Sequence, residues 1–110
     1  MADNKPKLFL FAVIQVKPEY FSAAKAALDE IIQPTLEEPG CHVFSAFVIK
    51  DRSDTLHLFE CFENEDALNA HYAQDYTTSV FKKYETWLSA PVEVTKMYAS
   101  SQVSWEQFHA

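Results

Sequence analysis

The chain has 110 residues, of which 48% are hydrophobic and 15% aromatic, so it is long enough for one domain with its own hydrophobic core. Its formal net charge of -7 argues against binding to nucleic acid or to an anionic membrane surface, because both need clustered lysine and arginine side chains. It contains a single glycine, which excludes the glycine-rich loops that bind phosphate groups.

The first part of the chain predicts a strand followed by a helix. The strand, 8–16, is apolar on both faces, which indicates that both faces are covered. Pro18 suits a first helical position, and an apolar stripe at helical spacing follows over 21–32. Pro34 is expected to kink or end this helix, and Gly40 is expected to supply a left-handed turn before the next strand.

The middle of the chain predicts a β-hairpin. Two strands, 41–50 and 56–62, flank a polar turn at 51–54 and carry apolar residues on both faces. Glu60 interrupts one apolar face of the second strand. Because burying a lone carboxylate is costly, we expect Glu60 either to face a wet pocket or to have a partner.

Two helical segments and a last strand complete the pattern. Asn64 is a candidate N-cap for a helix over 64–73, and the helical spacing places His71 on the face that meets the sheet. A second helical run follows over 75–88. The last strand, 92–98, alternates apolar and polar residues.

This order predicts an α+β fold of the ferredoxin-like βαββαβ type, with a four-stranded antiparallel sheet. Residues 1–7 form an N-terminal arm, 8–98 the domain and 99–110 a C-terminal tail. The helices can cover one face of the sheet, and the other apolar face would be larger than soluble monomers usually expose. We therefore expect a two-fold homodimer, sheet against sheet, with the aromatic tail lying across the partner.

Several short motifs resemble the antibiotic biosynthesis monooxygenase domain over about 8–98. They are Glu-Pro-Gly-Cys at 38–41, Phe-Glu-Cys-Phe at 59–62, the helix start at 65–71 and Tyr-Thr at 76–77. The resemblance implies a dimeric α/β barrel with a pocket between the helices and the sheet of each subunit. It also implies, as in many members, oxidation without metal, flavin or haem. A deprotonated phenol or hydroquinone itself passes an electron to dioxygen, and the protein supplies a base, a dry cavity and oxyanion donors.

Compared with haem-degrading relatives, the chain has Phe62 where a tryptophan usually ends the third strand and Gln15 where the first strand carries an asparagine. No histidine follows His71 in the run through Leu88. We therefore expect no haem, and the resemblance to members that work without cofactors implies no other cofactor. His71 and Asp75 lack a third ligand, so we expect no metal site either.

His71 is the leading candidate for a catalytic base, since an imidazole can accept a phenolic proton near neutral pH. Glu60 could orient it, although the same pair could simply tie the helix to the sheet. Tyr76 is the candidate oxyanion donor. The predicted substrate-binding walls are Phe44, Phe62, Tyr72 and Phe81.

The remaining reactive residues have simpler expected roles. His42 and His57 are expected at the solvent or the dimer seam, and Cys41 and Cys61 as reduced thiols in strands. With no signal-peptide pattern at the start and no apolar run near the ~20 residues of a membrane span, we expect a cytoplasmic protein.

The leading functional hypothesis is a cofactor-independent monooxygenase that acts on a small aromatic or quinol-type molecule. The alternatives are an isomerase that transfers protons on a small carbonyl compound, and a non-catalytic dimeric module that binds a small ligand. A pocket too small for a ring, or one sealed by Phe44, Phe62 and Phe81, would favour the last. An RNA-recognition domain shares the strand order but needs exposed aromatics among basic residues, and this chain lacks that pattern.

Overall fold

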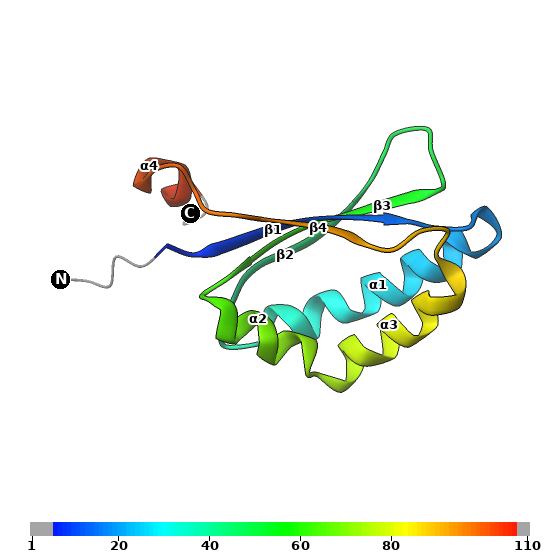
Figure 1. Ribbon diagram of the computed structural model, residues 1–110, viewed down its shortest axis with the longest axis horizontal. Helices are drawn as coiled ribbons and strands as arrows, with labels where there is room; N and C mark the ends of the chain where they lie inside the picture. Colours follow the sequence, from blue (N-terminus) through cyan, green and yellow to red (C-terminus); the bar gives the residue numbers. More distant parts are fainter. Residues whose placement is uncertain (1–5, 108–110) are drawn as a thin grey trace.

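The computed structural model describes residues 6–107, and in it a four-stranded antiparallel sheet carries the main helices on one face (Figure 1). The strands pair in the order β2-β3-β1-β4, which confirms the ferredoxin-like α+β fold. The strands are β1 (Leu8–Gln15), β2 (Cys41–Val48), β3 (Thr55–Phe62) and β4 (Glu93–Met97). The helices are η1 (Pro18–Tyr20, a 3-10 turn), α1 (Phe21–Leu36), α2 (Glu65–Tyr72), α3 (Asp75–Trp87) and α4 (Gln102–Glu106).

The strands that are apolar on both faces direct alternate side chains to an inner face, toward the helices, and to an outer face. This is the arrangement that the two-residue alternation of a strand predicts. On the inner face, Leu10 pairs with Glu60, which in turn pairs with Phe44. On the outer face, Phe11 pairs with Phe59. The inner face and helices α1 and α3 enclose the main core, whose buried residues are Ala12, Ile14, Val16, Ala24, Ala27, Leu28, Ile31, Phe44, Leu56, Leu58, Val80 and Tyr84.

Of the two outcomes expected at Pro34, an end of the helix does not occur: α1 continues through Pro34 to Leu36, since the proline removes a single backbone hydrogen bond. The prediction for the turn at Gly40 is wrong. Gly40 is not left-handed; among the described residues the positive φ belongs to Asp51, at 66°, in the β2–β3 turn. Aspartate tolerates this conformation better than most residues, so the hairpin turns without a glycine.

The predicted cap of the second helix is confirmed. The Asn64 side chain accepts a hydrogen bond from the backbone N–H of Ala67 at 2.9 Å, and this satisfies one free donor of the first turn of α2. At the other end of the helical layer, the Tyr84 hydroxyl donates to the carbonyl of Ala24 at 2.8 Å. This bond ties α3 to α1 inside the core.

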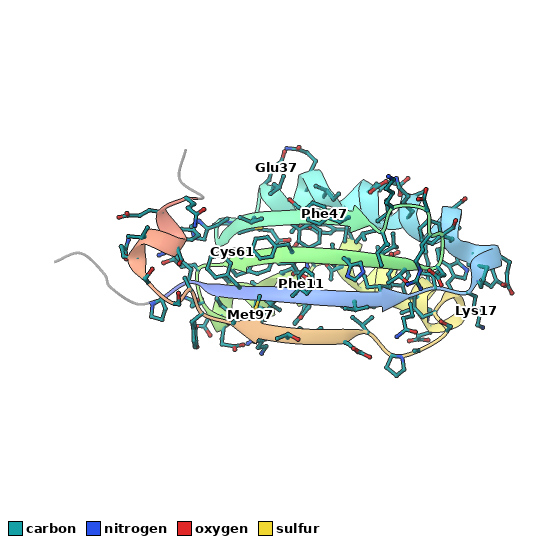
Figure 2. The ribbon with its side chains drawn as sticks, turned by 90° about the horizontal axis from the view of Figure 1, so that it is seen from above. Phe11, Lys17, Glu37, Phe47, Cys61 and Met97 are labelled. Carbon is teal, nitrogen blue, oxygen red and sulfur yellow. The ribbon has the colours of Figure 1, made fainter. Side chains whose placement is uncertain are left out.

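The outer face of the sheet carries exposed aromatic and apolar side chains (Figure 2). Phe11 is 41% exposed, Phe47 54% and Met97 36%. Helices α1 to α3 all lie on the opposite face, while α4 and the β2–β3 turn flank the outer face at its two ends (Figure 1). The apolar face that the sequence predicts is therefore present and is not covered by the helical layer.

The tail contains a short helix that the sequence analysis did not predict. Trp105 of α4 packs edge-on against Phe9, with ring centroids 5.6 Å apart, and against His42 at 5.5 Å. The tail therefore covers one end of its own sheet. Phe108 and His109 lie outside the described residues. No helix within residues 6–107 combines the length and apolar character needed to cross a membrane.

Candidate functional site

The candidate site is a cavity of about 140 Å³ between the inner face of the sheet and the three helices of the helical layer. Strands β1, β2, β3 and β4 and helices α1, α2 and α3 all contribute to its walls. Phe81 on α3 and Val94 on β4 line it and are each 45% exposed, so the cavity reaches the solvent between these two elements. The lining residues are Ala12, Ile14, Leu28, Ile31, Phe44, Leu58, Glu60, His71, Tyr72, Thr77, Val80, Phe81, Tyr84, Val92 and Val94.

His71 lies in the wall of this cavity and is 3% exposed. Its Nδ1 lies 3.0 Å from Oε2 of Glu38, in the turn after α1. The same oxygen accepts a hydrogen bond from the Tyr76 hydroxyl at the start of α3. Because Oε2 acts as the acceptor for both groups, the proton of His71 is assigned to Nδ1, and Nε2 keeps its lone pair. Glu38, His71 and Tyr76 are called the Glu38 cluster below.

Gly40 brings the Glu38 cluster together. A Cβ atom at Gly40 would lie 2.4 Å from Cβ of Ala67, so only a glycine allows the turn to pack this closely on α2. Ala67 and His71 are four residues apart and therefore share one face of the helix. Glu38 lies two residues before Gly40, and His71 lies one helical turn after Ala67. The close contact between Gly40 and Ala67 therefore brings Glu38 next to His71.

Tyr76 is not among the residues that line the cavity, and its hydroxyl contacts the turn after α1. Besides Glu38, this hydroxyl lies 3.3 Å from the carbonyl oxygen of Pro34. Burial, followed by the hydrogen bond to Glu38 and the charge of Glu38, raises the pKa of the Tyr76 phenol. The phenol therefore stays protonated near neutral pH and holds Glu38 in place.

Glu60 is the second acidic group of the site. It lines the cavity from β3, is 5% exposed, and has no hydrogen bond to any other residue in the described part of the chain. Burial, and then the nearby charge of Glu38, raises the pKa of Glu60 to about 7. Near neutral pH this carboxyl group can therefore either donate or accept a proton within the cavity.

The sequence as a whole matches a known family. The sequence model of antibiotic biosynthesis monooxygenases matches residues 8–83, more than half of the chain. The chain belongs to the antibiotic biosynthesis monooxygenase family.

Two curated relatives of this family member are similar over most of its length. It is 30% identical over 88 residues to Rv0793 of Mycobacterium tuberculosis, and the match covers 80% of this chain and 86% of that protein. It is 29% identical over 85 residues to the Synechocystis protein sll1783. That second match covers 77% of this chain but 57% of the relative.

Solved structures agree with the family fold. The crystal structure of PA3566 from Pseudomonas aeruginosa superposes with a TM-score of 0.85 at 20% identity, over 91% of this chain and 100% of that one. The structure of Rv0793 superposes with a TM-score of 0.77 at 28% identity, over 83% and 92% of the two chains. At 20% identity the first likeness shows the fold alone.

Within this family fold, five of the seven predicted site residues line the cavity: Phe44, Glu60, His71, Tyr72 and Phe81. The other two do not. Phe62 is fully buried in a second cluster with Leu8, Leu10 and Leu68, although its ring lies 5.2 Å from that of His71. Tyr76 instead belongs to the Glu38 cluster, and its predicted role as an oxyanion donor stays a prediction.

The suggested bond between Glu60 and His71 is absent from the structure, because His71 pairs with Glu38 instead. Two residues of the site, Glu38 and Thr77, are not among the predicted site residues. In the sequence they stand out only as members of the Glu-Pro-Gly-Cys and Tyr-Thr motifs. Thr77 lines the cavity, is 2% exposed, and its hydroxyl has no hydrogen-bond partner among the described residues.

The two cysteines are free thiols, and Cys61 is fully buried. Burial, and then the charges of Glu38 and Glu60, raises the pKa of Cys41 to about 12, while burial and the neighbouring Cys41 raise that of Cys61 to about 12. Neither thiol is therefore activated as a nucleophile. Across residues 6–107, no three His, Cys, Asp or Glu side chains gather as a metal site would require.

Proposed function

We propose that the protein is a monooxygenase that oxidises a small phenol or hydroquinone with dioxygen and requires no cofactor. Membership of the antibiotic biosynthesis monooxygenase family supports monooxygenase chemistry on a small molecule. The observation that carries the proposal is His71 in the wall of an apolar cavity, with Nδ1 held by Glu38. With Nδ1 bonded to Glu38, Nε2 is the nitrogen that is left to accept a proton from a ligand in the cavity.

The proposed chemistry begins with proton transfer. Nε2 of His71 takes a proton from a hydroxyl group of the substrate, and Glu38 stabilises the imidazolium that forms. The resulting electron-rich anion reduces dioxygen directly. For a hydroquinone, one oxygen atom enters the ring and the other leaves as water. The ring supplies the four electrons and becomes a hydroxyquinone.

The walls of the cavity support this reaction by excluding water. Phe44 packs on His71, with ring centroids 5.4 Å apart, and Tyr72 packs on it at 5.8 Å. In a dry environment, charge–charge interactions are stronger than in water. The attraction between Glu38 and a protonated His71 therefore favours proton transfer more than it would at the surface.

The test is dioxygen consumption by metal-stripped protein with a panel of hydroquinones and anthrones. Replacing His71 with Gln should lower the turnover rate by about a hundredfold or more, which is the usual contribution of a general base. His42→Gln is the matched control, because His42 pairs with the surface residue Glu63 at 2.8 Å and lies outside the cavity. No turnover with the wild type, or equal turnover in the His71→Gln variant, would refute the proposal.

A second candidate is a proton-transfer enzyme that isomerises a small carbonyl compound. The observation that favours it is Glu60, which lines the same cavity as His71 and has a pKa of about 7. With an imidazole and a carboxyl group on the same cavity, one group could remove a proton at one carbon and the other could return one at another. This activity needs no dioxygen, so turnover under nitrogen distinguishes it from the monooxygenase.

A non-catalytic binding module is less well supported by the cavity. Its volume of about 140 Å³ is close to the ~150 Å³ of an engineered apolar cavity that holds benzene. Phe81 stands at the opening, and Phe62 lies outside the lining, so these rings do not seal the cavity. The volume is therefore sufficient for a single ring.

The proposal includes a homodimer formed by the outer faces of two sheets. Phe11, Phe47 and Met97 give this face an apolar surface on three strands. Between them lies His57, stacked on Phe11 with ring centroids 5.8 Å apart. Covering such a face in water is favourable by about 25 cal/mol per Å² of apolar surface, which supports association of two copies.

A further inference from the structure

The cavity contains a buried hydroxyl group that the proposed chemistry does not use. Thr77 lies in the first turn of α3, and its Oγ1 atom is buried without a hydrogen-bond partner among residues 6–107. An unpaired buried polar group is unfavourable, and in native structures it usually indicates a function or a missing partner. Thr77 lines the cavity, so a ligand there could supply the partner.

The second unpaired polar group lies on a different wall. Glu60 reaches the cavity from β3 and, like Thr77, has no hydrogen bond to another described residue. A ring with one hydroxyl group can donate one hydrogen bond, so it can satisfy only one acceptor of the cavity. A second oxygen on the ring gives Thr77 a hydrogen-bond partner of its own while the first oxygen bonds to His71 or Glu60.

The charge of the walls limits the ligand further. No lysine or arginine is among the lining residues, whereas Glu60 is, and Glu38 lies directly behind His71. A carboxylate or phosphate on the ligand would lose its hydration and meet negative charge without a cation. The site therefore disfavours anionic ligands.

The volume sets the size. About 140 Å³ matches the ~150 Å³ cavity that accommodates benzene, and a fused second ring would have to displace wall residues. Because protein interiors are closely packed, such displacement is unfavourable.

From these observations we infer that Thr77 is a ligand-binding residue and that, with Glu60, it selects a neutral single-ring compound bearing two oxygens, such as a dihydroxybenzene. This inference rests on the proposed function, whose site it shares. It assigns a specificity role to Thr77 and an upper limit of one ring to the substrate.

The experiment measures binding by calorimetry under nitrogen, so that no turnover occurs. The ligands are hydroquinone and catechol, phenol with one oxygen, 1,4-dihydroxynaphthalene with two rings, and 4-hydroxybenzoate with a carboxylate. Hydroquinone or catechol should bind at least about tenfold more tightly than the two-ring diol and the carboxylate. A two-ring diol that binds as tightly as hydroquinone, or a panel without any binding, would overturn the inference.

The variant Thr77→Val removes the hydroxyl group and keeps the shape of the side chain. It should weaken the binding of the dihydroxybenzenes by about five- to tenfold, the usual loss for one hydrogen bond, and that of phenol by less than about twofold. Thr78→Val, one residue away on the exposed face, is the matched control and should change neither. An equal loss for phenol and hydroquinone, or no loss, would show that Thr77 is not an anchor.

Thermal unfolding provides a readout that is independent of ligands. Because Thr77→Val removes an unpaired buried hydroxyl, the melting temperature of the free protein should stay the same or rise while affinity falls. A variant that merely damaged the fold would lower both. If hydroquinone binds as described but the protein consumes no dioxygen with it, this inference stands and the proposed function fails. If only a two-ring quinol binds and is turned over, the proposed function stands and this inference fails.

Discussion

Replacing Glu60 with Gln should stabilise the protein above neutral pH and flatten the dependence of its stability on pH. Glu60 sits between Leu10 and Phe44 on the inner face of the sheet and is 5% exposed. Burial first, and the charge of Glu38 second, disfavour its ionised form and raise its pKa from 4.5 to about 7. Gln keeps the size of the side chain but cannot ionise.

The size and sign of the effect follow from proton linkage. In the unfolded chain Glu60 loses its proton near its ordinary pKa of 4.5, but in the folded chain near 7. The folded state therefore holds the extra proton between these values, and the free energy of unfolding falls as the pH rises through this range. A difference of 7 - 4.5 = 2.5 in pKa, at about 1.36 kcal/mol each, is worth about 3 kcal/mol.

The assay is urea unfolding from about pH 4.5 to about pH 8 at one fixed protein concentration, since association also changes apparent stability. The difference between Glu60→Gln and wild type should be small at the acidic end and reach about 3 kcal/mol above pH 7. The exposed Glu30→Gln variant is the control and should follow the wild type. Parallel curves for wild type and Glu60→Gln would refute the burial argument for this carboxyl group.

Four further predictions concern packing, capping, the Glu38 cluster and association. Gly40→Ala should lower the free energy of unfolding by about 1–3 kcal/mol through the clash with Ala67. In the same urea assay, adding Ala67→Gly should recover part of this loss. A Gly40→Ala variant as stable as the wild type would contradict the close contact. Asn64→Ala should cost about 1 kcal/mol by removing the cap of α2, while the exposed Asn69→Ala should cost less; equal losses would argue against capping. Tyr76→Phe should lower kcat several-fold, because Glu38 loses the hydrogen bond that fixes it and so supports His71 less well. KM should change little, because Tyr76 does not line the cavity. A change in KM alone would place Tyr76 at the ligand. By light scattering, the wild type should have twice the 12.6 kDa mass of the chain, and the Phe47→Lys variant should have the mass of one chain. The control Leu36→Lys, at an exposed apolar position on α1, should stay a dimer. A monomeric wild type would refute the sheet-to-sheet interface.

Much of the fold could be predicted because its signals are local. Alternation along β1 and β3 assigned each apolar residue to a face, and Asn64 marked the start of α2 through a side chain three residues from its partner. The same alternation placed Glu60 on the inner face, and helical spacing placed His71 opposite the sheet. Both residues do line the cavity.

The hydrogen bonds of the site could not be predicted because they depend on how distant elements pack. Glu38 and His71 are 33 residues apart, and their contact requires α1 to continue past Pro34 and the turn to approach Ala67. A lone glycine in a turn suggested a left-handed backbone, whereas here the missing Cβ serves close packing. Helical spacing puts Thr77 on the same face as Val80 and Phe81, but nothing in the sequence shows that its hydroxyl lacks a hydrogen-bond partner.

The edge strand β4 lines the cavity at its opening and takes no part in the Glu38 cluster. It pairs with β1 and contributes Val94 to the wall, and the segment just before it contributes Val92, but no residue of β4 bonds to Glu38, His71 or Tyr76. Under the proposed function, the residues that would limit substrate size and those that would transfer protons therefore lie on separable parts of the chain. Trimming Val92 and Val94 is accordingly the route by which an engineer, or a diverging descendant, could admit bulkier molecules while leaving the imidazole in its working orientation.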